Sequence, residues 1–103
     1  MAEQMSIACG TALDMDTVNE VQSTLMDALG QGKTLVLDLS EVSSFDTAGL
    51  QLLCVVAGAA KTRGVDLQFH RPQGSLTTAV QVLDLEKYLG NWPTGQDEMS
   101  ETA

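Results

Sequence analysis

The feature that most constrains this sequence is a compact apolar segment, Leu-Val-Leu-Asp-Leu, at residues 35–39. A strand that is apolar on both sides is typical of the interior of a parallel sheet, where both faces are covered. Residues 5–9 predict a short strand, and residues 65–70 predict another with one face exposed to water, because apolar and polar residues alternate there. We therefore expect residues 35–39 to form the central strand.

Helical segments separate these strands. Apolar residues recur at steps of three and four and form one stripe, which predicts an amphipathic helix that ends at Gly30. Its members are Val18, Val21, Leu25, Ala28 and Leu29. Thr17 and Glu20 have the spacing of a capping box at the start of this helix.

Two further helices are predicted later in the chain. One runs from about Thr47 to Arg63 and is closed by Gly64. The next begins with Ser75 as its cap and is expected to have Leu76, Ala79, Val80 and Leu83 on its inner face. Residues 85–89 can form either another helical turn or a short extended piece.

The order of strand and helix alternates along the chain, which predicts a mostly parallel sheet with right-handed crossovers. The loops that follow parallel strands emerge at one edge of the sheet, where open α/β sheets place their functional sites. This edge is expected to carry Asp14, Ser43, Ser44, Asp46, Thr47, Arg71 and Gln73.

Length and charge limit the class of partner. The chain has 103 residues, enough for one domain, and its 14 acidic and 5 basic residues give a net charge of −9. The basic residues are scattered, so nucleic-acid binding is not expected, and an anionic membrane surface would repel the chain. No apolar run approaches the roughly 18 residues of a membrane span. With no signal-peptide pattern at the N-terminus, we expect a cytoplasmic protein whose partner has a basic face.

Catalytic and metal chemistry receive little support. Cys9 and Cys54 lie in apolar surroundings without zinc-ligand spacing, and are expected to be buried thiols. Asp14, Asp38 and Asp46 could hold Mg²⁺ only if they converged, and nothing in their spacing requires it. The single histidine is expected at the end of a strand and half-buried, so a nucleophilic triad is unsupported. We therefore predict no enzyme activity, no metal and no cofactor.

The start of the second predicted helix is more informative. Asp46 stands at the N-cap position, where its carboxylate can accept backbone N–H groups. Thr47 follows at the first helical position, beside unpaired N–H groups that could receive a phosphate. Gly49 in the first turn costs up to about 1 kcal/mol relative to Ala, so we expect another backbone or a partner to approach it closely.

The same helix is apolar on two faces. Leu50, Leu53, Cys54 and Ala57 share one face. Ala48, Leu52, Val55, Val56 and Ala59 share the opposite face. Since one face covers the sheet, the other is covered either by neighbouring helices of this chain or, in part, by a partner protein. The second alternative predicts a docking face that includes Leu52 and Val56.

The segment from Leu35 to Leu50 resembles the STAS domain, the family of bacterial anti-sigma-factor antagonists. An apolar strand ending in Asp-Leu is followed by a short loop and then by Asp-Thr-Ala-Gly-Leu at residues 46–50. Gly10–Asp14 and Leu83–Leu89 resemble flanking family segments. The resemblance implies an α/β, STAS-like fold over residues 1–92, with a mostly parallel or mixed sheet of about four strands and helices packed against it. Few residues precede Gly10, which leaves room for the loss of the first edge strand, and residues 93–103 are expected to be an acidic disordered tail.

The resemblance also implies a function. STAS members of this kind are not enzymes; a protein-kinase-like anti-sigma factor binds them and phosphorylates a Ser or Thr, which ends the binding. Thr47 falls on the phosphoacceptor position. The expected partner-binding residues are Asp14, Ser44, Asp46, Thr47, Ala48, Gly49, Leu52 and Val56. Two alternatives remain, a STAS subunit seated on the ATPase of a bacterial lipid transporter and an adaptor in a chemotaxis or other signalling complex, and the oligomeric state is open.

Overall fold

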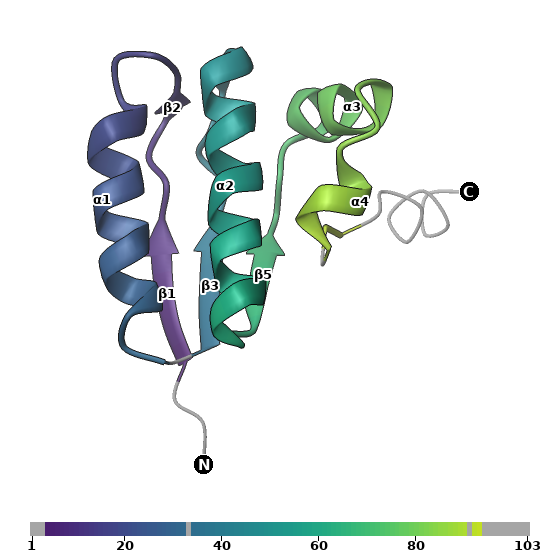
Figure 1. Ribbon diagram of the computed structural model, residues 1–103. Coiled ribbons are helices and arrows are strands. Elements are labelled where there is room, and N and C mark those ends of the chain that lie inside the picture. The colour runs from purple at the N-terminus through teal and green to yellow at the C-terminus, as the bar shows by residue number, and fades with distance from the viewer. Residues whose placement is uncertain (1–3, 33, 91, 94–103) are drawn as a thin grey trace.

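A sheet of three parallel strands lies at the centre of the protein (Figure 1). The computed structural model describes residues 4–32, 34–90 and 92–93. The strands β1 (Gln4–Ala8), β3 (Thr34–Asp38) and β5 (Leu67–His70) are ordered β1-β3-β5. The predicted α/β class and the central place of residues 35–39 are therefore confirmed. The sequence predicts one sheet of about four strands. The described residues instead form this three-stranded sheet and a separate pair of two-residue strands, β2 (Ala12–Leu13) and β4 (Ser44–Phe45).

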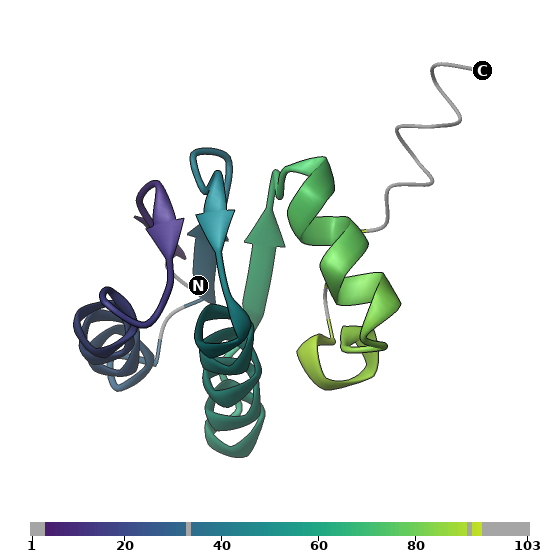
Figure 2. The ribbon, with the colours of Figure 1, turned by 90° about the horizontal axis from the view of Figure 1, so that it is seen from above.

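The two sides of β3 are both buried, as predicted. Leu37 is aligned with Ile7 and Phe69 and belongs to the main apolar cluster. Val36 is aligned with Ser6 and Gln68 and is buried outside that cluster. Two helices, α1 (Val18–Leu29) and α2 (Thr47–Arg63), cover one face of the sheet. Two shorter ones, α3 (Gly74–Val82) and α4 (Glu86–Leu89), lie beyond the β5 edge (Figure 2).

Helix α1 (Val18–Leu29) begins differently from the sequence prediction. Asp14 Oδ1 accepts the N–H groups of Asp16 and Thr17, which turns the chain into the helix. The Thr17 hydroxyl donates backward to the Ala12 carbonyl oxygen at 3.0 Å. No side-chain cap bond forms at Thr17, so the predicted capping box with Glu20 is wrong.

Helix α2 (Thr47–Arg63) packs against α1 on one side and α4 on the other. It ends at Gly64, whose backbone φ of 70° is in the left-handed region that favours glycine. Because it has neighbours on both sides, burial extends over more than one face. Leu52 and Val56 lie in the main apolar cluster, so their prediction as a docking face is wrong. The exposed stripe instead contains Gln51 and Val55.

The last helices close the β5 edge. Helix α3 (Gly74–Val82) has Gln73 at its N-cap without a side-chain cap bond, so Ser75 does not cap it. Residues 86–89 form the short helix α4 (Glu86–Leu89), which decides between the two predicted alternatives. Beyond α4, the buried Trp92 ring packs on Phe69 with ring centroids 5.1 Å apart. The predicted tail, from residue 94 onward, lies outside the described residues.

Leu37→Ala should lower the free energy of unfolding by about 2–5 kcal/mol, because the Leu37 side chain is 0 % exposed and its truncation leaves a cavity in the core. Urea denaturation followed by circular dichroism measures this change. The matched control is Val82→Ala, at a position that is 75 % exposed, which should change stability by less than about 0.5 kcal/mol. A loss below about 1 kcal/mol for Leu37→Ala would contradict the central position of β3.

Candidate functional site

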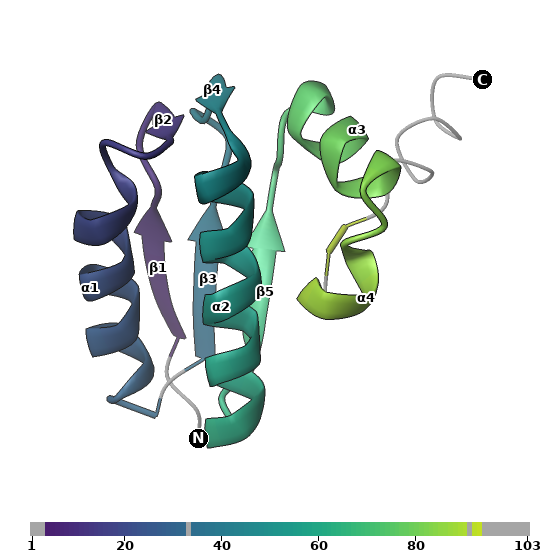
Figure 3. The ribbon, with the colours of Figure 1, turned by 45° about the horizontal axis from the view of Figure 1, so that its top comes forward.

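The candidate site lies at the edge of the sheet where β1, β3 and β5 all end. There β2 and β4 lie side by side, with Ala12 opposite Ser44 and Leu13 opposite Phe45 (Figure 3). The Ser43 N–H donates to the Thr11 carbonyl oxygen at 2.9 Å, and the Asp46 N–H donates to that of Leu13 at 3.2 Å. These bonds join the loop after β1 to the loop after β3. The predicted gathering of the strand-end loops at one edge is confirmed, and Gln73 joins it by donating to the Ser40 carbonyl oxygen at 2.9 Å.

Gly49 in the first turn of α2 lies directly against the backbone of Leu13 in β2. It is buried, and a Cβ at its position would lie 2.7 Å from the carbonyl carbon of Leu13 and 2.9 Å from the Leu13 Cβ, with the Leu13 carbonyl oxygen closer still. Any side chain would therefore displace either the helix or β2. The backbone approach predicted from this glycine is provided by the chain itself.

Asp46 fixes the start of α2 with both carboxylate oxygens. Oδ1 accepts the Gly49 N–H at 3.0 Å, which is an N-cap bond. Oδ2 accepts the Met15 N–H at 3.1 Å, from the loop that follows β2. One side chain thus caps the helix and binds the neighbouring loop, so its orientation is determined from two directions.

Thr47 follows this cap at the first position of α2 and is exposed. The first N–H groups of a helix have no partner within the helix. Gly49 donates to the Asp46 side chain and Leu50 to the Asp46 carbonyl oxygen. Within the described residues, the N–H groups of Thr47 and Ala48 donate no hydrogen bond. The Thr47 hydroxyl therefore lies beside two available donors and next to the exposed carboxylate of Asp46.

The structure divides the predicted partner-binding residues into two groups. Those at least partly exposed at the edge are Asp14, Ser44, Asp46, Thr47 and Ala48. Gly49, Leu52 and Val56 are buried, so they cannot contact a partner directly in this conformation. The reason is the same for all three: α2 packs on the β2 loop, the sheet and α1 with more of its circumference than a helical wheel indicates.

The aspartates at this edge bind backbone groups rather than one another. Asp14 Oδ1 accepts the Asp16 and Thr17 N–H groups, and Asp38 Oδ1 accepts the Ser40 N–H at 3.0 Å. That hydrogen bond, together with the nearby charges of Arg71 and His70, holds the pKa of Asp38 below its usual value. In residues 4–32, 34–90 and 92–93, no three His, Cys, Asp or Glu side chains gather as metal ligands would. The predicted half-burial of His70 is wrong, because this side chain is exposed at the end of β5.

In a comparison with protein families, the chain matches the family model described as Mlab, STAS domain, over residues 2–91. The chain belongs to the STAS family. The predicted resemblance is thereby confirmed. Comparison with curated proteins found no significant match.

Solved structures show the same fold at low sequence identity. The anti-sigma factor antagonist SpoIIAA in its unphosphorylated form has a TM-score of 0.70 and 16% identity, covering 99% of this chain and 90% of its own. The phosphorylated form from Bacillus has a TM-score of 0.66 at 16% identity, covering 100% and 94% of the two chains. The murine Solute Carrier 26 family member A9 anion transporter has a TM-score of 0.67 at 20% identity, and the match covers 79% of this chain but 14% of the transporter. Among the described helices of this STAS domain, none is long and apolar enough to cross a membrane.

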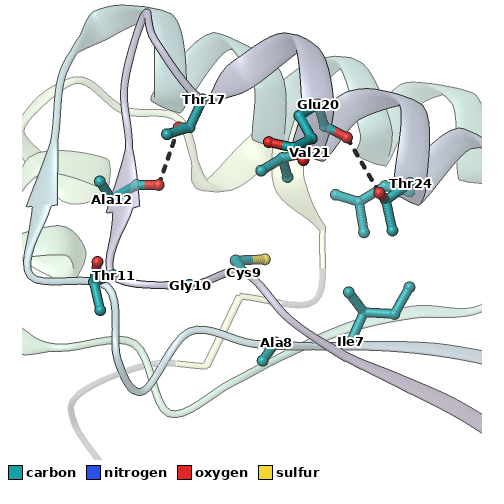
Figure 4. A pocket seen from close by; sticks show the side chains of 11 residues that line it. Ile7, Ala8, Cys9, Gly10, Thr11, Ala12, Thr17, Glu20, Val21 and Thr24 are labelled. Carbon is teal, nitrogen blue, oxygen red and sulfur yellow. Dashed lines mark hydrogen bonds between the residues drawn. The ribbon is translucent and has the colours of Figure 1, made fainter.

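Two surface hollows lie near the STAS site. One, of about 340 Å³, lies between the end of β1 and α1, with Cys9, Thr17 and Thr24 around it (Figure 4). Thr17 and Thr24 donate to the carbonyl oxygens of Ala12 and Glu20, so these hydroxyls are already engaged within the chain. The other hollow begins at Thr47 itself. We call it the Thr47 groove, about 530 Å³ in volume and lined by Thr47, Leu50, Gln51, Cys54, Val55, Leu83 and Leu85.

Sequence reasoning did not find this groove or the β2–β4 pair. Two-residue strands are too short to show a periodic pattern. The predicted place of Leu83 on the inner face of the third helix is wrong, because α3 ends at Val82 and the Leu83 side chain is exposed. Nothing in the spacing of Leu83 and Leu85 places them beside Val55. Gly49 was the one available signal for β2, because a glycine in the first turn of α2 indicates that another backbone segment lies close to it.

Gly49→Ala should destabilise the protein by about 1–3 kcal/mol or more, because the new methyl group overlaps the Leu13 backbone. The matched control is Gly58→Ala in the same helix, where a Cβ meets no atom within 4 Å. This control should raise stability by up to about 1 kcal/mol through helix propensity alone. Thermal denaturation of both variants measures the difference. Equal stability of the two would contradict the close approach.

Cys54 should react with iodoacetamide well before Cys9. Burial, aided by the charge of Asp38, raises the pKa of Cys9 to about 11, so at pH 8 only on the order of 0.1 % of it is thiolate. Burial raises the pKa of Cys54 as well, but this side chain is only partly buried and lines the Thr47 groove. Peptide mapping by mass spectrometry should find the first label on Cys54. Label on Cys9 at the same rate would contradict the burial of that thiol.

Proposed function

We propose that this STAS domain is a phosphorylation-switched protein-binding module of the anti-sigma factor antagonist type, with Thr47 as its phosphoacceptor. The observation that carries the proposal is the setting of Thr47, an exposed hydroxyl at the first position of α2 beside a rigidly held carboxylate. Family membership and the likeness to an antagonist solved in both unphosphorylated and phosphorylated forms support it. In this proposal the protein is cytoplasmic and is a binding partner rather than an enzyme.

A phosphate on Thr47 would alter the surface without unfolding it. It adds about −1.5 to −2 charges and three acceptor oxygens. The free N–H groups of Thr47 and Ala48 can donate to these oxygens, and the positive end of the α2 dipole favours the charge. Asp46 cannot rotate away from the phosphate without losing its bonds to Met15 and Gly49. The modified edge would therefore carry two fixed negative groups where the unmodified edge carries one.

Partner binding at this edge then becomes sensitive to phosphorylation. A partner that covers Thr47 removes water from its hydroxyl at little cost, whereas covering a phosphate beside Asp46 requires removing water from a dianion. Each 1.4 kcal/mol of this cost weakens binding tenfold. The proposed contact residues are Asp14, Ser44, Asp46, Thr47 and Ala48. The net charge of −9 favours a partner with a basic face, such as a kinase-like anti-sigma factor, over a nucleic acid.

A second candidate function is a subunit bound to a transporter. The specific observation in its favour is the likeness to an anion transporter, which covers 79% of this chain. In that case Thr47 would be a contact residue that is not phosphorylated. A constitutive adaptor in a signalling complex would behave in the same way.

Thr47→Ala should retain partner binding and lose phosphorylation, while Thr47→Glu should weaken binding because it adds charge beside Asp46. The effect of Glu is expected to be partial, since it carries one charge on a planar head. The measurement is phosphosite mapping after incubation with the cognate kinase and ATP, combined with binding titrations of each form. The matched control is Thr62→Glu, which adds the same charge at an exposed position in the last turns of the same helix.

Two results would contradict the proposal. Label on Ser43 or Ser44 with none on Thr47 would move the phosphorylation site to the preceding loop. Absence of label, together with equal binding by the Thr47→Glu and Thr62→Glu variants, would instead support the constitutive transporter or adaptor function.

A further inference from the structure

The Thr47 groove joins the proposed phosphorylation site to an exposed apolar surface. It extends along α2 from Thr47 to Val55, and its other wall is the connection between α3 and α4. Val55 and Leu83 are large apolar side chains that remain 50 % and 54 % exposed. Single exposed apolar residues are common on protein surfaces. These two line the same apolar groove and so form a continuous apolar surface, which is typical of a binding site.

The backbone of the α3–α4 connection holds Leu83 in this position. Asp84 has a φ of 58°, in the left-handed region, which Asp tolerates better than most residues. The turn is held by hydrogen bonds from the Leu83 N–H to the Ala79 carbonyl oxygen and from the Leu85 N–H to that of Val80. Leu83 is therefore exposed because the turn is fixed, and the groove exists before any partner binds.

The charges around the groove are acidic. Asp46 precedes Thr47 at one end, and Asp84 and Glu86 flank Leu85 in the other wall. Lys87 is paired with Asp84 at 3.2 Å, so these two charges partly compensate each other. Asp46 and Glu86 supply the other negative charges at the groove. The whole chain carries a net charge of −9. A partner that enters this groove should therefore bring positive charge around an apolar centre.

The groove also limits the backbone conformation of its occupant. Its walls are a helix and the connection between two helices, and no strand edge lines it. An extended peptide would find no ladder of backbone donors and acceptors there, whereas a helix satisfies its own backbone groups. Thr47 to Val55 spans about 12 Å at 1.5 Å per residue, which matches two turns of a bound helix.

We propose that the Thr47 groove receives one amphipathic helix of the protein partner. Its apolar face covers Val55 and Leu83, and its Lys or Arg side chains lie near Asp84 and Glu86. This inference rests on the proposed function and names the partner surface that recognises the same site. A phosphate on Thr47 would stand at the end of the groove, where a bound apolar side chain would have to remove its water.

A designed helical peptide tests the groove without requiring the natural partner. The probe is a fluorescent peptide of about 14 residues with Leu at helical spacing on one face and Lys elsewhere. One control peptide has Glu in place of Lys, and the other has the same composition with Leu distributed around the helix. Fluorescence anisotropy with the full, unphosphorylated chain should show the probe binding more tightly than either control. Bound probe should also slow alkylation of Cys54, which lines the groove.

Variants of exposed residues locate the binding surface. Val55→Gln and Leu83→Gln should each weaken probe binding about tenfold. The matched control, Val82→Gln, changes the neighbouring residue, which is more exposed but does not line the groove, and should bind as the parent does. Asp84→Asn removes a charge while keeping a residue that tolerates the left-handed turn, so it should weaken binding more at low salt than at high salt.

The inference is overturned if Val82→Gln loses as much binding as Leu83→Gln, or if the Glu peptide binds as well as the Lys peptide. These readouts use the unphosphorylated chain. A failed phosphosite experiment therefore refutes the switch but leaves the groove intact, and a failed peptide experiment does the reverse.

Discussion

The contact between the Gly49 backbone and the Leu13 carbonyl group is the constraint on which the candidate site depends. It brings the first turn of α2 against β2 more closely than any side chain would allow. At this distance Asp46 can cap the helix with one oxygen and reach the Met15 N–H with the other. Without the close approach the same aspartate would be an ordinary N-cap, and the Met15 N–H would lose its bond to the start of α2.

This arrangement separates stability from recognition at adjacent residues. Gly49 and Leu50 face inward and hold the helix to the rest of the domain, whereas Thr47 and Gln51 are exposed. Asp46 contributes to both. Its carboxylate forms the hydrogen bonds that hold the start of α2, and its negative charge lies at the surface. A modification at Thr47 can therefore change the charge of the surface while the buried contacts one turn further on stay unchanged.

Much of the fold could be predicted from the sequence, because its signals are local and strong. The apolar run at 35–39, the stripe that ends at Gly30 and the glycine at position 64 each follow from periodicity or backbone conformation. Asp46 as a cap and Gly49 as a point of close approach were predictable for the same reason. The faces of α2 were not, because Leu52 and Val56 belong to the main apolar cluster while Val55 is exposed, and this division depends on elements that come together only in three dimensions. The Thr47 groove depends on the turn at Asp84, whose left-handed backbone has no distinct sequence signature.

The tilted packing of Trp92 on Phe69 ties the residue after the last described helix to the sheet. Trp92 follows the last helix, yet it is buried and belongs to the main apolar cluster. Its indole is the only one in the sequence, so intrinsic fluorescence emission reports directly on whether the segment after α4 remains seated on β5. A chain cut after Leu89 would keep all the described helices and strands and still expose an aromatic surface on the outer strand. The part of the domain that the structure describes therefore extends past its last helix to the Trp92 side chain.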